Sequence, residues 1–198
     1  MKNKIKTFGR FILLLVLTSF TSDNLPKSFT NLLDRANLTF QNPVGFNETK
    51  IIDNQQLNYD YAIKDSERNF EIRYVIRPLD STLINYEEFV RNNKTSFITH
   101  PNKMYSMLFQ EMILNLSGGK YSEITEFDKQ SVNQEFNADW GAVTFIEVGK
   151  EFGQKYEFGM ILAIHKDNFG DAYCILLSEN EVGFKELMAD GFHSVKFK

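Results

Sequence analysis

Cysteine is nearly absent from the sequence, since Cys174 is the only one among 198 residues. A single cysteine cannot form an internal disulfide, so the fold must depend on its core for stability. Cys174 lies in the apolar, strand-like run 172–177, and no evident helix N-terminus or basic neighbour is present to lower its pKa. We expect a buried, unreactive thiol rather than a nucleophile.

An excess of positive charge is also lacking. The chain has 22 Lys and Arg against 26 Asp and Glu, which gives a formal net charge of −4. Acidic and basic residues are interspersed, so no broad positive field is available to bind nucleic acid phosphates. We therefore exclude nucleic acid as a partner.

Recognisable catalytic and cofactor motifs are missing as well. The sequence has no Gly-x-Ser-x-Gly elbow and no glycine loop of the phosphate-binding type, and it predicts no cofactor. The three histidines, His100, His165 and His193, match no local zinc pattern, so we predict no metal site. A site assembled in space is the alternative to three unrelated histidines.

The longest apolar run near the N-terminus is too short to cross a bilayer. It comprises residues 11–17, after Lys2, Lys4, Lys6 and Arg10, and small polar residues follow it. This order is typical of a secretory signal peptide, which we place at residues 1–22 with cleavage near Thr21 or Ser22. An uncleaved anchor or a buried helix is the alternative. We therefore expect an extracytoplasmic protein, periplasmic or secreted, with no stable membrane span after cleavage.

Large apolar side chains are plentiful, with 19 Phe and 8 Tyr, and hydrophobic residues make up 42% of the chain. These values suit one globular domain. We expect a linker or short helix at residues 23–36 and a single domain at residues 37–198.

Alternating apolar residues predict a sheet of antiparallel strands. Residues 59–63 and 70–76 form the clearest hairpin, and strands are also expected at 121–127, 140–148, 156–164 and 172–177. The segment 156–164 is apolar on both faces, which indicates a strand covered on both sides. We expect helices at residues 101–116 and 181–190 to provide this cover, with a shorter helix at 85–93 and a closing edge strand at 193–197. The predicted fold is α+β, an α/β/α sandwich with a central antiparallel β-sheet covered by helices on both faces.

This element order resembles the Mog1/PsbP-like superfamily. The residues that carry the likeness are Phe40, Pro43, Gly45 and Phe46 near the start, and the closing run 140–197. The chain looks like an exported bacterial member of unassigned role. The resemblance implies a binding or accessory role, because such roles are commoner in this superfamily than enzymatic activity. None of its partner-binding residues can be matched here.

Two groups of residues are candidate binding sites. Asp139 and Trp140 stand at the start of a core strand, where a carboxylate could orient a ligand and an indole could stack on it. The alternative is that Asp139 bonds backbone amides while Trp140 packs under a helix. Glu71, Arg73 and Arg77 are expected on the outer face of the hairpin, as a partner surface or an ordinary solvated face.

The turn at residues 167–171 also has two interpretations. Its carboxylate and amide oxygens invite a calcium site, but it lacks the glutamate and the ligand spacing of a calcium loop. Asn, Gly and Asp are also what a hairpin turn requires, and we favour the turn.

The sequence therefore favours an exported, non-catalytic binding or accessory domain. Its partner would be another envelope or secreted protein, reached through the sheet face or the strand-end loops. One alternative is an extracytoplasmic hydrolase with a site near Asp139 and His165, and another is a carrier of a small apolar ligand.

Overall fold

The computed structural model describes residues 25–181, 184, 188 and 191–198. The predicted signal peptide, residues 1–22, lies outside them, and so does most of the predicted helix at 181–190. The elements in chain order are α1 (Lys27–Arg35), β1 (Leu38–Phe40), β2 (Asn47–Glu48), β3 (Tyr61–Asp65), β4 (Phe70–Pro78), α2 (Asp80–Asn92), the short 3-10 helix η1 (Pro101–Lys103), α3 (Tyr105–Leu116), β5 (Ile124–Glu126), α4 (Lys129–Phe136), β6 (Trp140–Glu147), α5 (Lys150–Gly153), β7 (Phe158–Lys166), β8 (Gly170–Ser178) and β9 (Val195–Phe197).

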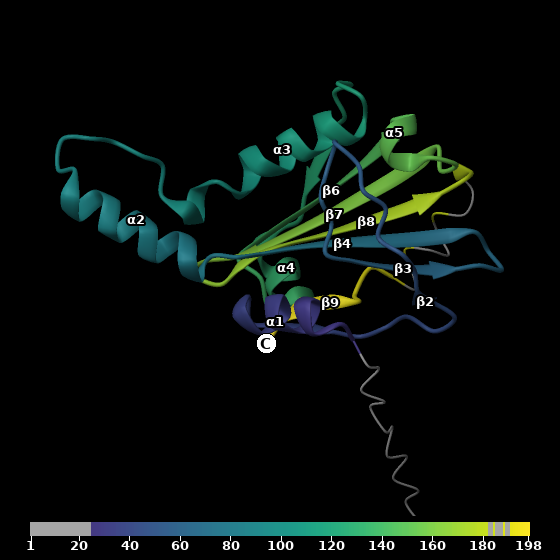
Figure 1. Cartoon of the computed structure of the whole chain (residues 1–198), viewed down its shortest axis with the longest axis horizontal. Coiled ribbons are helices and arrows are strands. Elements are labelled where there is room, and N and C mark those ends of the chain that lie inside the picture. The colour runs from purple at the N-terminus through teal and green to yellow at the C-terminus, as the bar shows by residue number, and fades with distance from the viewer. Residues whose placement is uncertain (1–24, 182–183, 185–187, 189–190) are drawn as a thin grey trace, which may run out of the picture.

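A seven-stranded antiparallel sheet forms the centre of the protein (Figure 1), in the order β2-β3-β4-β8-β7-β6-β5. Short connections join β3 to β4 and β7 to β8, as the alternating pattern predicts. The middle strand β8 is buried along its whole length, and β7 is buried from residue 159 to residue 165. The expectation of a strand covered on both sides at 156–164 is confirmed.

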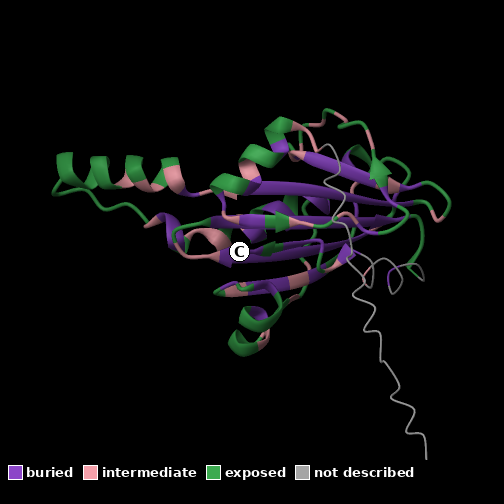
Figure 2. Cartoon of the chain, turned by 90° about the horizontal axis from the view of Figure 1, so that it is seen from below, coloured by how far each residue is buried: buried purple, intermediate pink, exposed green. Residues whose placement is uncertain are grey.

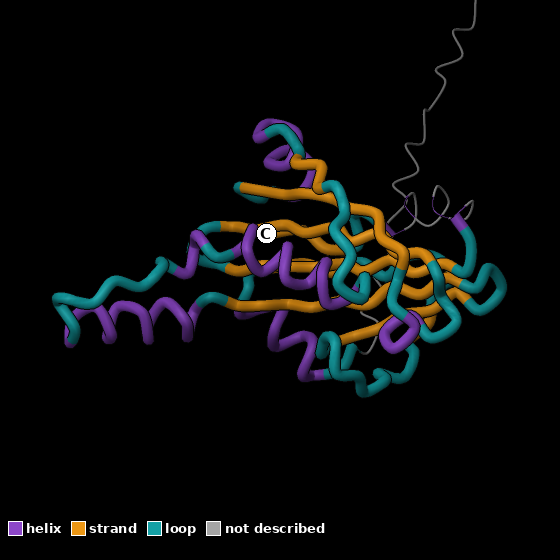
Figure 3. Tube along the Cα trace, turned by 90° about the horizontal axis from the view of Figure 1, so that it is seen from above, coloured by secondary structure: helices purple, strands orange, loops and turns teal. Residues whose placement is uncertain are grey.

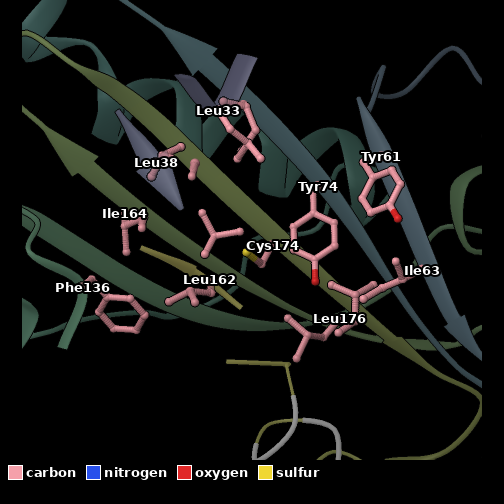
Figure 4. Close-up of a cluster of buried hydrophobic side chains, with 14 of the residues drawn as sticks. Leu33, Leu38, Tyr61, Ile63, Tyr74, Phe136, Leu162, Ile164, Cys174 and Leu176 are labelled. Carbon is pink, nitrogen blue, oxygen red and sulfur yellow. The ribbon is translucent and has the colours of Figure 1, made fainter. Parts of the chain in front are cut away.

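One face of the sheet packs against α3 and α5, and the other against α1, α4 and the strands β1 and β9 (Figure 1). The core on this second face, the one that α1 and α4 cover, contains Tyr74, Cys174 and Leu176 from the sheet. Leu33 of α1 and Leu38 of β1 lie opposite them (Figure 4). The protein is thus a mixed α+β fold with a large antiparallel sheet covered by helices.

The second face is covered in part as expected. Phe184 and Met188, which belong to the predicted helix at 181–190 and lie among the described residues, pack in this core, but α1, α4 and a two-stranded sheet of β1 and β9 also lie on the face and were not predicted there. The predicted edge strand at 193–197 was wrong in its pairing, because β9 pairs with β1 and not with the main sheet. The segment 23–36 supplies the helix α1 rather than a linker.

Other boundaries moved as well. The predicted strand at 121–127 shortens to β5, and the helix α4 after it was missed, although Asp128 caps it by accepting bonds from the amides of Gln130 and Ser131. The predicted helix at 101–116 divides into η1 and α3. The predicted helix at 85–93 extends back to Asp80, and none of its residues is buried in the core.

Candidate functional site at the strand ends

Four side chains form a row across the sheet at one end of its central strands. Arg77 of β4 pairs with Asp171 of β8, Asp171 pairs with His165 of β7, and His165 pairs with Trp140 of β6. Side chains at directly opposite positions of antiparallel strands point to the same face. The row therefore lies on one face, the face covered by α3, and we call it the strand-end row.

His165 is the centre of this row and is held by two carboxylates. Its side chain is 1% exposed, with Nδ1 2.7 Å from Oδ1 of Asp171 and Nε2 3.0 Å from Oδ1 of Asp167. Burial by itself lowers the pKa of His165, but the hydrogen bonds to the two carboxylates and their negative charges outweigh it, so the pKa is raised. The site favours a charged imidazolium.

Aromatic rings of α3 cover the row. The ring of Tyr105 stacks on His165 at a centroid distance of 4.3 Å and lies 4.7 Å from the ring of Trp140. One turn later, Phe109 contacts Trp140 at 5.9 Å and Tyr173 at 6.4 Å. Trp140 therefore packs under a helix and is half-buried, as one of its two predicted roles requires.

Asp139 stabilises the neighbouring turn. Its side chain is exposed, its carboxylate accepts a hydrogen bond from the amide of Asp167 at 2.9 Å, and its own amide donates to the carbonyl of His165 at 2.9 Å. The structure thus brings Asp139 and Trp140 together with His165, and it gives Asp139 a backbone amide to bond.

Arg77 reaches the same site from the opposite end of the row. It is half-buried beside Asp171 and close to the hydroxyl of Tyr173, which is buried without a hydrogen-bond partner among the described residues. Burial raises the pKa of Tyr173, the charge of Asp171 adds to the shift, and Arg77 opposes it without meeting the geometry of a hydrogen bond to the hydroxyl. Arg77 therefore belongs to the strand-end row and not to an outer face of the hairpin.

Glu71 and Arg73 lie elsewhere, and our expectation that they are exposed was wrong. Arg73 is 2% exposed, donates from Nε to Glu71 at 2.7 Å and bonds the carbonyl of Phe152 at 2.7 Å. Its guanidinium also lies over the rings of Tyr59 and Phe152, at 5.0 and 4.4 Å. Strand alternation could not show that the face carrying these charges is covered by α5 and by the loop before β3.

The turn between β7 and β8, residues 167–169, joins the strand-end row to a projecting segment. The amide of Leu79 donates to the carbonyl of Phe169 at 3.0 Å. Asn168 and Asn102 exchange two hydrogen bonds of 3.0 Å, one through the Asn102 Nδ2 group and one through the Asn168 amide. The turn therefore contacts the chain immediately before α2 and again within η1.

Residues 80–100 leave and rejoin the body at these two contacts, and we call them the arm. Figures 1 and 3 show α2 extending away from the sheet, with the chain returning alongside it. None of the 13 residues of α2, all within the described chain, is buried, and the helix stays largely green in Figure 2. The arm exposes apolar side chains at Ile84, Phe89, Val90, Phe97 and Ile98.

The arm has few contacts that hold its helix. At the start of α2, Arg35 makes two hydrogen bonds to the carboxylate of Asp80, of 2.8 and 2.7 Å. Further along, the ring of Tyr86 lies 4.6 Å from that of His100. The arm was not predicted from the sequence, because whether a helix at 85–93 packs on the body or projects from it depends on contacts with distant segments.

Three further features bear on the alternatives. A pocket of about 360 Å³ lies between β5 and α4, but Asp128 at its edge caps α4 and Glu135 pairs with His193. Within the described ranges, no group of three or more His, Cys, Asp and Glu side chains is arranged to hold a metal ion. In the same part of the chain, no helix combines the length and the apolar character needed to span a membrane.

The comparisons with known proteins leave the geometry as the main source of functional argument. No protein-family model matches the chain, and no curated protein matches it.

Proposed function

We propose that this chain is an exported, non-catalytic binding module of the Mog1/PsbP-like type, and that it engages another envelope or secreted protein through the arm. The observation that carries the proposal is that α2 buries none of its residues although the arm bears five exposed apolar side chains. The predicted signal peptide and the element order of the domain support export and the superfamily resemblance.

The helix α2 has little packing within the protein itself. Helices of about 13 residues are marginal in water without packing. Arg35 bonds Asp80 and Ser81 at the start of α2 and Tyr86 lies against His100, but none of the helix residues is buried. A partner that covers its apolar side chains would supply the missing packing.

The mode of binding follows from the shape of the arm. A projecting helix with apolar side chains suits insertion into an apolar groove of a partner protein. The main sheet suits this role less, because both of its faces are covered by the protein's own cores. Of the two contact routes considered from sequence, the strand-end segments are therefore favoured over the sheet face.

The alternative of a hydrolase centred on Asp139 and His165 gains little from the geometry. A general base needs a ring nitrogen free to take a proton, and both nitrogens of His165 face carboxylates while its side chain is 1% exposed. Asp139 is occupied with the amide of Asp167. These contacts support a structural role for the strand-end row.

Photo-crosslinking in the native host tests the proposal. A benzophenone amino acid replaces Phe97 on the arm or, as a control, Val44, which is equally exposed on a loop of the body, at 94% and 93%. We expect an adduct from position 97 that is absent from position 44. The adduct should disappear when Ile84→Asp is added, because a charge on the arm would have to be buried in the partner groove.

The partner identified in this way is then purified and titrated with the protein. Ile84→Asp should weaken its binding at least about tenfold, the effect of one poorly placed group at an interface core. The same adducts from both positions, or binding unaffected by Ile84→Asp, contradict the proposal.

A further inference from the structure

The 167–169 turn connects the buried His165 to both ends of the arm. On one side it bonds Leu79 and Asn102, which flank the arm, and on the other Asp167 bonds Nε2 of His165. We infer that the protonation state of His165 sets how firmly this turn holds the arm, so that the arm is fixed when the imidazole is charged and loosened when it is neutral. This regulation rests on the proposed function of the arm as the binding element.

The two carboxylates around His165 differ in their exposure. The Asp171 side chain is 3% exposed and the Asp167 side chain is 47% exposed. A charged imidazolium has two N–H groups and can donate to both, whereas a neutral ring has only one. An unpaired buried carboxylate is far more costly than an exposed one, so the remaining proton belongs on Nδ1, facing Asp171.

The neutral ring then repels the turn. With its proton on Nδ1, the Nε2 lone pair points at an oxygen of Asp167 only 3.0 Å away, and neither atom can donate. Asp167 can turn to water because it is half exposed. The turn then keeps the amide bond to Asp139 but loses its charged anchor to the sheet.

His165 is the group of this site that changes its protonation near neutral pH, because the charged and titratable groups around its ring do not. Tyr105 stacks on the ring, and its pKa is raised by burial and by the charges of Glu126 and Asp167, so it stays neutral. On the far side of Asp171, Arg77 lies at the paired position of β4 and the buried Tyr173 stays neutral, while Lys166 donates to Asn137.

The direction of the pH effect follows from the contacts. The pKa of His165 is raised above its ordinary value of 6.5, so the folded protein stabilises the charged form. The anchor is complete below about pH 6.5 and is lost as the pH rises through the raised value. Alkaline conditions therefore loosen the arm, and acidic conditions fix it.

Hydrogen exchange in the isolated protein tests this inference without any partner. The amides of Leu79 and Asn168 report the two contacts between the turn and the arm, and the amide of Leu162 in β7 serves as a reference for the intact sheet. We expect the protection factors of Leu79 and Asn168 to fall about tenfold between about pH 5.5 and about pH 9, the size expected for losing one charge-assisted hydrogen bond. The reference should change little.

Asp167→Asn is the decisive variant. An amide at position 167 can accept from the charged ring and donate to the neutral one, so protection of Leu79 and Asn168 should no longer depend on pH. His193→Gln and His100→Asn remove the other described histidines, and His100→Asn keeps a side chain able to cap η1. Both variants should retain the response of the natural protein.

A nitrogen NMR titration of the His165 ring provides a second measurement that needs no variant. The expected course is a doubly protonated ring at low pH that becomes the Nδ1–H tautomer at high pH. Protection that does not change with pH, an equal fall in Asp167→Asn, or an Nε2–H tautomer overturns the inference. A failure of the crosslinking experiment alone leaves these results standing, so the two proposals can be separated.

Discussion

Nδ1 of His165 lies 2.7 Å from Oδ1 of Asp171, and both side chains are almost completely buried at the ends of adjacent strands. The pair is the innermost part of the strand-end row. It places a charge-assisted hydrogen bond inside the face of the sheet that α3 covers, where an unpaired partner would be costly.

His165→Ala should destabilise the protein strongly. The change leaves the Asp171 carboxylate buried without its partner, and breaking a buried pair from one side costs about 3–5 kcal/mol. Urea unfolding measures the loss. The matched control is His193→Ala, whose pair with Glu135 is exposed and should account for no more than about 1 kcal/mol. Equal effects of the two substitutions would show that the buried pair does not contribute as we argue.

Arg73→Ala should also be costly, because it leaves Glu71 buried and unpaired and removes the bond to the carbonyl of Phe152. We expect a loss of about 3–5 kcal/mol in the free energy of unfolding. Replacing both partners by Glu71→Leu and Arg73→Met should cost less than Arg73→Ala alone, since no charge is then left unpaired. Arg91→Ala on the exposed arm is the control and should lie within about 0.5 kcal/mol of the natural protein. A double variant less stable than Arg73→Ala contradicts this account.

Truncation of Phe97 should have little effect on the free energy of unfolding, whereas truncation of Phe109 should have a large one. Phe97→Ser should change the free energy of unfolding by less than about 0.5 kcal/mol, because the ring is 94% exposed. Phe109→Ala should cost about 3–5 kcal/mol, because its ring is fully buried against Trp140 and Tyr173. Thermal or urea unfolding of both variants provides the comparison. A large loss from Phe97→Ser would mean that the arm contributes to the fold of the free protein.

The thiol of Cys174 should be inert in the folded protein. Burial raises the pKa of the Cys174 thiol to about 12, so almost no thiolate is present near neutral pH. A disulfide reagent such as dithiobisnitrobenzoate should therefore react only after unfolding in denaturant. Thr95→Cys, which adds an exposed thiol on the arm, should bring one rapidly reacting equivalent and serves as the positive control. Rapid labelling of the natural protein would contradict the buried position of Cys174.

The strand-end row was only partly predictable from sequence. Trp140 and His165 were named as candidates, with the neighbouring Asp139, because an acid beside the only tryptophan and a histidine at a strand end stand out. Arg77 was also named, but on an exposed face of the hairpin. Asp171 was assigned to turn chemistry, although its place opposite His165 in the β7–β8 hairpin could have been obtained by counting residues on each side of the turn. Tyr105 carried no such signal, because it reaches the row through the packing of α3.

The pattern of apolar residues by itself determined the central hairpins, the doubly covered strand β7 and the buried Cys174, because side-chain alternation reports directly which faces of a strand avoid water. Only the tertiary structure decided that Arg73 is buried, that β9 pairs with β1 and that residues 80–100 project as an arm. Each of these depends on segments far apart in the chain coming together or failing to do so. The local pattern of apolar residues does not report such long-range contacts.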